Sequence, residues 1–291
     1  MRNCFCNFAI TENNKNQYTM KRLITIFATM LGVACGTATQ NSLTIEEIDA
    51  ELTTMLMKER ETSFYMDDNG YVEKLSLQRD FAEHLEYHLN NPLTFEAEMP
   101  QLAKMVKIRT TPNGKCKFYS YKVYCCGAVG SSRNYIQYKD DSGTVRCIPY
   151  LNNLLSSRNI CDVWEFECFG VEYYAIKSCR YYEVDWWTFA LEIITINDGV
   201  VYPVGNFFPE DADVITRESY NLYDADGEYI ESISSSALYM DVCNTAYADS
   251  EVDFDFDPET LTLTIADEVE DEDGRFVIEN SVYQLLNPEA Y

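Results

Sequence analysis

The only two histidines of the chain, His84 and His88, stand four residues apart. On a helix this spacing places both rings on one side, one turn apart, where they can hold a metal ion. The HExxH signature of zinc peptidases is not met, because Leu85 follows the first histidine where that signature has glutamate. His88 also lies within an apolar stripe, and His84 lies just outside it. The spacing therefore favours a pair at the boundary of the core, with a metal site as the alternative.

Acidic residues offer a second candidate for metal binding. Three aspartates alternate with two phenylalanines near the C-terminus, and on a strand this sends the carboxylates to one face and the rings to the other. The string is similar to an EF-hand loop, but Pro258 and Thr264 stand where such a loop has glycine and glutamate. Weak Ca²⁺ binding is the hypothesis here, and ordinary hairpin turns are the alternative. The aspartates concerned, including two in a turn before Gly227, are Asp253, Asp255, Asp257, Asp224 and Asp226.

No catalytic constellation stands out. A serine or cysteine nucleophile needs a neighbouring base, and a pairing with histidine could use only the two already named. Glycosidase carboxylates are recognised by their separation in space, so 48 acidic residues indicate no particular pair. Glu192 lies in an otherwise apolar segment, where burial would raise its pKa and suit it to acid or base catalysis. The favoured interpretation is a solvated edge, so no catalytic residue, and no cofactor other than Ca²⁺, is predicted.

The chain has eleven cysteines, of which three fall within the first 38 residues. The other eight are an even number, which in an exported chain indicates disulfides and leaves 105 pairings open. None has the CxxC spacing of a zinc site. These eight cysteines are Cys116, Cys125, Cys126, Cys147, Cys161, Cys168, Cys179 and Cys243.

Two helices are expected to carry the histidines and the chain before them. Thr44 and Glu47 form a capping box ahead of apolar residues that repeat every three to four positions, which predicts a helix to about Lys58. A second helix is expected from Leu77, with Ser76 as its N-cap, to Leu89, where Asn-Asn-Pro ends it.

After Met99 the apolar period changes to two, and turn sequences rich in Gly, Asn and Asp recur between the strand-forming runs. Residues 186–196 are apolar on both faces apart from Glu192 and the threonines, as in a central strand covered on both sides. The predicted fold class is α+β, with two N-terminal helices followed by a large antiparallel β-sheet or sandwich built as a hairpin meander. Residues 39–291 are expected to form one domain, with a helical part at 39–98 and a β-rich part at 99–291.

Residues 21–32 have the order of a secretory signal peptide, with two basic residues before a short apolar run and small residues after it. We expect the start to be Met20, and residues 1–38 to be upstream sequence plus this signal. The run is too short to span a bilayer. A buried apolar helix is the alternative, and lipidation at Cys35 would be the one route to a membrane. The protein is therefore expected in the periplasm, the cell envelope or the extracellular space.

The formal net charge of −26 restricts the partners. Nucleic acids and anionic lipid surfaces bind to positively charged protein surfaces, so neither is expected to bind to this acidic chain. Cations, basic proteins and neutral glycans remain as ligands.

The stretch 107–149 resembles a group of exported, uncharacterised proteins of gut Bacteroidota. The residues that match are Pro112-Asn113-Gly114-Lys115, Tyr119-Ser120-Tyr121 and Tyr138-Lys139, and the sequence departs from the group at Tyr121-Lys122 and Cys125-Cys126-Gly127. The resemblance implies export and one continuous domain, and it implies no activity. Together with the composition, it favours a non-enzymatic exported protein that binds a protein or glycan ligand through an acidic face. A carboxylate-dependent glycan hydrolase is the alternative.

Overall fold

The computed structural model describes residues 43–62, 68–124, 130–140, 142–149, 158–183, 186–208, 215–223, 228–243, 253–270 and 276–285. Contacts divide the chain into Met1–Leu43 and Thr44–Tyr291, and the fold below is that of the second unit. The predicted upstream sequence, signal peptide and Cys35 lie outside the described residues. Among those that are described, no helix combines the length and the hydropathy that spanning a bilayer requires.

The first helix, α2 (Ile45–Glu61), begins as the sequence predicts. The Thr44 side chain accepts from the Glu47 amide at 3.3 Å, and the Glu47 carboxylate accepts from the Thr44 amide at 2.8 Å. This capping box satisfies two of the amides that a helix start leaves without partners.

The second helix, α3 (Asp68–Leu89), begins nine residues before the predicted start at Leu77. The reason is tertiary: Lys74, on this added part, is buried and pairs with the Glu59 carboxylate of α2 at 3.2 Å. Gln78 donates to the same carboxylate at 2.9 Å. The Asn-Asn-Pro sequence ends α3 as predicted, and Asn91 caps a short helix, α4 (Pro92–Glu96).

The described residues after α4 contain one 3₁₀ helix, η2 (Leu102–Lys104), and thirteen strands in three antiparallel sheets. The first sheet has the order β1-β2-β3-β4, the second β5-β6-β7-β10-β9 with β8 beside β7, and the third β11-β12-β13. The predicted α+β class with antiparallel hairpins is therefore confirmed. The strands are β1 (Lys107–Thr110), β2 (Cys116–Tyr124), β3 (Gly130–Lys139), β4 (Val145–Pro149), β5 (Asn159–Cys168), β6 (Val171–Glu183), β7 (Trp186–Asn197), β8 (Val200–Pro203), β9 (Ile215–Tyr223), β10 (Tyr229–Cys243), β11 (Asp253–Asp257), β12 (Thr262–Glu270) and β13 (Phe276–Gln284).

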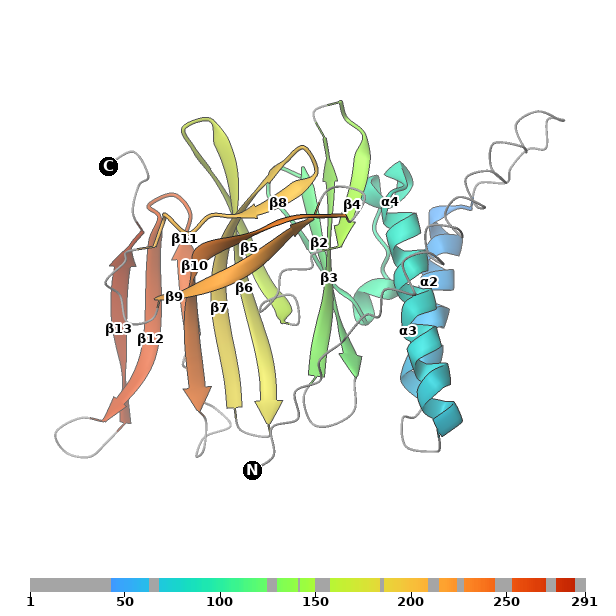
Figure 1. The fold of residues 1–291 in the computed structure, drawn as a ribbon, viewed down its shortest axis with the longest axis horizontal. Helices are drawn as coiled ribbons and strands as arrows, with labels where there is room; N and C mark the ends of the chain where they lie inside the picture. Colours follow the sequence, from blue (N-terminus) through green and yellow to red (C-terminus); the bar gives the residue numbers. More distant parts are fainter. Residues whose placement is uncertain are drawn as a thin grey trace, which may run out of the picture. The chain divides into compact units, whose positions relative to one another are not determined.

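Three core clusters join these elements in layers (Figure 1). The helices pack on one face of the first sheet through residues that include Leu52, Leu85 and Tyr119. The opposite face of that sheet packs on the second sheet through residues that include Phe118 and Ile176. The other face of the second sheet packs on the third sheet through residues that include Leu191 and Phe256. Alternate residues of a strand point to opposite faces of its sheet, so the second sheet can present apolar side chains to both of its neighbours.

Strand β7 is a central strand, as predicted. It pairs with β6 on one side and β10 on the other. Leu191 and Ile193 belong to the cluster with the third sheet, whereas Ile194 belongs to the cluster with the first sheet. Both faces of β7 are therefore covered, which explains its nearly continuous apolar sequence.

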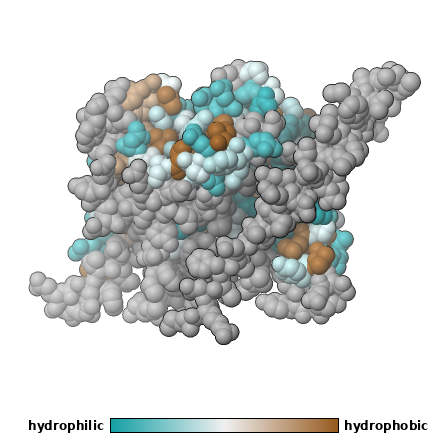
Figure 2. Space-filling view, in the orientation of Figure 1, coloured by the Kyte–Doolittle hydropathy of each residue, from teal (hydrophilic) through white to brown (hydrophobic). Residues whose placement is uncertain are grey.

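The described surface carries small hydrophobic groups among hydrophilic residues in the view of Figure 2. The exposed hydrophobic residues come from separate elements, such as Tyr87 on α3, Tyr229 on β10 and Val282 on β13. Single exposed hydrophobic residues are normal on a globular protein and indicate no binding surface by themselves.

Candidate metal centre

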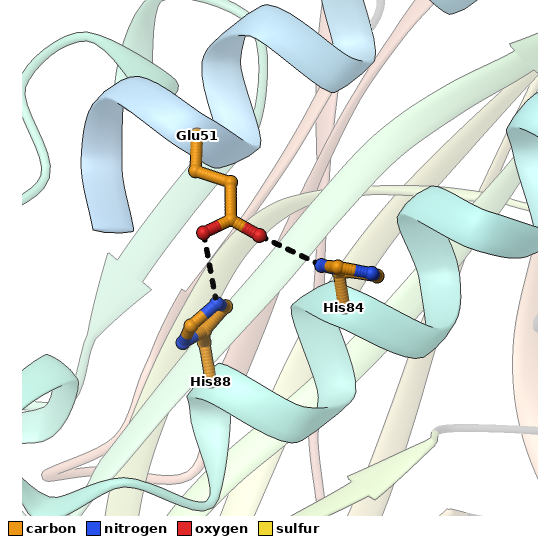
Figure 3. A group of neighbouring side chains, drawn as sticks. All are labelled: Glu51, His84 and His88. Atoms are coloured by element: carbon orange, nitrogen blue, oxygen red, sulfur yellow. Dashed lines mark hydrogen bonds and ion pairs between the residues drawn. The ribbon is translucent and has the colours of Figure 1, made fainter. Parts of the chain in front are cut away.

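Glu51 of α2 lies between His84 and His88 of α3, with one carboxylate oxygen toward each ring (Figure 3). The Glu51 Oε1 atom is 2.8 Å from His84 Nδ1, and Oε2 is 3.7 Å from His88 Nε2. One donor atom from each of the three residues lies within 4.8 Å of the other two. In the part of the chain that the structure describes, this is the only such group of three or more His, Cys, Asp or Glu residues.

The packing of α2 against α3 sets this geometry. Leu52 of α2 and Leu85 of α3 are fully buried in one cluster, and Glu51 and His84 directly precede them in sequence. The two helices therefore bring the glutamate and the histidines together at the edge of their apolar contact. The C-terminal end of α3 is also fixed, because the His88 carbonyl accepts from the Thr94 hydroxyl at 2.8 Å and from the Asn91 amide at 2.9 Å.

The two histidines differ in exposure, as the position of the apolar stripe predicts. The His88 side chain is 5% exposed, whereas the His84 side chain is 50% exposed and that of Glu51 33%. Burial lowers the pKa of His88 below its ordinary value, and the nearby Glu51 carboxylate opposes this effect only in part. His88 is therefore neutral at pH 7, the form that binds a metal.

The spacing of the donors suits a small tetrahedral ion. With metal–ligand bonds of about 2.0–2.1 Å, tetrahedral ligand atoms lie roughly 3.3 Å apart, between the two distances observed here. The exposed side of Glu51 and His84 leaves room for a water molecule as the fourth ligand. Two imidazoles and one carboxylate are donors that Zn²⁺ and related transition metals prefer over Ca²⁺ or Mg²⁺.

The glutamate of this group was not predicted from the sequence. Glu51 is one of 48 acidic residues and stands 33 positions before His84. Its location three residues after Ile48 and one before Leu52 marks it as a border residue of α2, and that is the one local signal. The predicted pair at the core boundary is confirmed, and the structure adds the carboxylate that the metal alternative lacked.

The aspartates predicted as a Ca²⁺ site lie elsewhere. Asp255 and Asp257 are exposed on β11, while Phe254 and Phe256 are buried, so the predicted alternation is confirmed for these residues. The Asp257 carboxylate accepts from the Thr260 hydroxyl at 2.7 Å and from the Glu259 amide at 2.9 Å. These bonds lower the pKa of Asp257 and account for its place in the hairpin.

Two parts of the Ca²⁺ hypothesis fall on residues whose side chains the structure does not describe. Asp224 and Asp226 lie outside the described residues, and Asp253 is placed on β11 by its backbone alone. Ca²⁺ binding by these aspartates stays a prediction.

Glu192 does not face a solvated edge, and that expectation was wrong. It is 1% exposed on β7, opposite Ile176 of β6. The reason is that Glu192 shares its face of β7 with Ile194 and stands opposite Ile176, and both of these residues pack against the first sheet, a contact between distant segments that no local pattern indicates. A glycan cannot contact a carboxylate buried to this extent.

A cleft of about 590 Å³ contains a second polar group that the sequence did not indicate. Lys115 and Tyr174 both donate to the Glu172 carboxylate, and the Cys116 thiol donates to the Tyr174 hydroxyl at 3.2 Å. Burial acts to raise the pKa of Glu172, but the bonds from Lys115 and Tyr174 outweigh it, so this pKa is lowered. Glu172 is therefore ionised at neutral pH, whereas the general acid of glycoside hydrolysis is protonated.

No known protein family, curated protein or solved structure matches the chain. The functional conclusion therefore rests on the geometry of the site.

Proposed function

We propose that this protein is a non-enzymatic, exported binding protein that takes a divalent transition-metal ion, Zn²⁺ in the first instance, at Glu51, His84 and His88. The observation that carries the proposal is the convergence of three donor atoms from two helices within 4.8 Å. The signal-like residues 21–32 support export, and the acidic composition raises the local concentration of any cation. A protein or glycan ligand on the acidic surface remains a further prediction.

Bound Zn²⁺ would link α2 to α3 at the surface of the helical layer. Glu51 comes from one helix and both histidines from the other, so the ion would bridge them near the C-terminal end of α3. An ion that binds the folded state and not the unfolded chain stabilises the fold by mass action, by about 2.7 kcal/mol at 100 times the dissociation constant.

The hydrolase alternative has weaker support. Glu192 is buried, and the pKa of Glu172 is lowered where a general acid would need it raised. Asp140, which lines the same cleft, also has a lowered pKa, because it accepts hydrogen bonds from Ser142 and Arg146.

The test is a Zn²⁺ titration of untagged protein that has been stripped with EDTA, followed by calorimetry or by competition with a chromophoric chelator. We expect one site in the wild type, and at least about a tenfold weaker affinity in Glu51→Gln and in His84→Gln, since loss of an outer-shell partner alone costs 10–100-fold. Glu46→Gln is the matched control, because it makes the same change at an exposed position of α2.

The variants also separate this site from any binding of Zn²⁺ by cysteine thiolates, which are Zn²⁺ ligands as well. Binding that is equally tight in the wild type and in His84→Gln would place the ion elsewhere and overturn the proposal. Competition by a hundredfold excess of Mg²⁺ or Ca²⁺ would also contradict it, because neither ion favours two imidazole ligands.

A further inference from the structure

Cys161 of β5 and Cys179 of β6 lie against each other across the edge of the second sheet, with 2.8 Å between their sulfur atoms. In the register of these strands, Asn159 pairs with Cys179, and Asp162 pairs with Lys177. Cys161 is therefore the extra residue of a β-bulge. Without the bulge Cys161 would stand opposite Lys177, as a diagonal neighbour of Cys179 on the same face of the sheet, and at the bulge the two sulfur atoms are in contact.

The surroundings of this pair favour reaction. Both cysteines are half-buried, so a small oxidant can reach them. The Cys161 thiol donates a hydrogen bond to Cys179, which lowers the pKa of Cys179 to about 7 and raises that of Cys161. The positive charges of Lys107 and Lys122 add to the lowering at Cys179. Cys179 is therefore the member of the pair that loses its proton more readily, and the thiolate is the form that attacks disulfides.

The other cysteines whose side chains the structure describes have no such arrangement with one another. Cys116, Cys147 and Cys168 are buried, and each belongs to a different core cluster. Cys116 and Cys147 face opposite sides of the first sheet. Burial raises the pKa of Cys116 to about 12 and also raises that of Cys147, which leaves both as unreactive thiols at neutral pH.

We propose that Cys161 and Cys179 form a disulfide bond when an external disulfide oxidant is present. The Cys179 thiolate attacks one sulfur of the oxidant, forms a mixed disulfide and expels one thiolate. Cys161 then loses its proton, and its sulfur attacks Cys179 and expels the second thiolate. Two protein thiols are oxidised, and one oxidant disulfide is reduced to two thiols.

The bond would join positions 18 residues apart across the β5–β6 hairpin. A cross-link of this length restricts the unfolded chain, and the expected effect is roughly a 100-fold shift of the unfolding equilibrium toward the folded state. It would also hold the bulged edge of β5 in place beside β1, where Arg109 donates to the Cys161 carbonyl at 3.1 Å.

The experiment uses the full chain, reduced, freed of reductant and then exposed to oxidised glutathione at pH 7.5. Free thiols are blocked with N-ethylmaleimide before tryptic digestion and mass spectrometry. Trypsin cuts after Arg158, Lys177 and Arg180, so the expected product is peptide 159–177 linked to peptide 178–180. Because Cys161 and Cys168 share the first peptide, fragmentation must place the link at Cys161.

Variants supply the matched control. Cys161→Ser is expected to abolish the linked peptide, and Cys168→Ser is expected to retain it. Two results in the wild-type protein would overturn the proposal. In the first, Cys161 and Cys179 are still free thiols after oxidation and are both found alkylated by N-ethylmaleimide. In the second, Cys179 is linked to a cysteine other than Cys161. Zn²⁺ affinity is measured in the same Cys161→Ser protein and should equal that of the wild type, so the failure of either proposal is recognised separately.

Discussion

At the scale of single residues, the molecule places charged and polar groups where partners from other segments satisfy them. The Glu51 carboxylate contacts both histidines. Between the same two helices, the Glu59 carboxylate pairs with Lys74 and accepts a hydrogen bond from Gln78. Gln137 is fully buried in the first sheet, where it donates to the Leu89 carbonyl at 2.6 Å and accepts from the Tyr119 hydroxyl at 2.8 Å. Buried polar groups of this kind are tolerated because hydrogen bonds such as these offset the loss of contact with water.

His88 makes the metal-free protein sensitive to acid. Its pKa in the folded state is below the ordinary value of 6.5, chiefly because of burial. As the pH falls below 6.5, His88 is therefore protonated in the unfolded chain before it is protonated in the folded state. This contribution to stability is therefore complete above pH 6.5 and is lost as the pH falls below it. In EDTA, we expect the free energy of unfolding to fall by up to about 1.4 kcal/mol per pH unit from this group.

Chemical denaturation between pH 7 and pH 5 measures the effect. His88→Gln should show a shallower dependence on pH than the wild type, while the exposed His84→Gln should keep most of it. If the free energy of unfolding depends on pH to the same extent in the wild type and in His88→Gln, His88 does not cause the sensitivity to acid.

At the scale of elements, single side chains connect segments that are distant in sequence. Asp49 of α2 is 2% exposed, and its two oxygens accept from the Gln101 amide at 3.0 Å and the Leu102 amide at 2.8 Å. These amides belong to the start of η2, which has no side-chain cap of its own. Asp49 therefore caps η2 from another helix and holds the connection between the helical layer and β1.

Asp49→Ala should destabilise the protein by about 1–3 kcal/mol, because it leaves a buried amide without an acceptor. Asp49→Asn should lose less, since its one oxygen still accepts from one of the two amides. Urea denaturation at pH 7 measures both variants, with Glu46→Ala as an exposed control on the same helix that is expected to change stability by less than about 0.5 kcal/mol. Equal stability of Asp49→Ala and the wild type would show that η2 does not depend on this cap.

At the scale of the whole molecule, layered packing and an acidic charge act in opposite directions. The charge of −26 favours expansion through self-repulsion, while three core clusters hold the helices and sheets together. Lys177 illustrates the balance: its ammonium group is buried, donates to the Phe254 carbonyl at 2.6 Å and lies 4.6 Å from the centre of the Phe254 ring. One buried cation thus joins the second sheet to the third in a very acidic chain.

Simple ions should therefore stabilise this protein without a specific site. In protein freed of Zn²⁺, we expect NaCl to raise the melting temperature, and Ca²⁺ and Mg²⁺ at matched ionic strength to raise it equally, because screening depends on charge. A Ca²⁺-specific rise of about 5–10 °C would instead indicate a real site on the acidic hairpins of Asp253, Asp255 and Asp257.

Local features of this protein were determined by the sequence itself. The capping box at Thr44, the end of α3 before Pro92, the hairpin turns within the described residues and the alternation around Phe256 depend on neighbours within a few residues, and the structure confirms each of these. Gly143 and Gly199 in two of these turns have φ of +79° and +82°, a region that glycine adopts without steric cost. From these local signals, the α+β class follows.

Only the tertiary structure decided which distant residues meet. The early start of α3 depends on Glu59, the burial of Glu192 on the packing of the second sheet against the first, and the completion of the histidine pair on Glu51. The contact of Cys161 with Cys179 depends on how β5 pairs with β6, and shifting that register by one residue would move the Cys161 side chain away. Local propensity acts over one turn or one hairpin, whereas these contacts are set by packing between segments that the sequence leaves far apart.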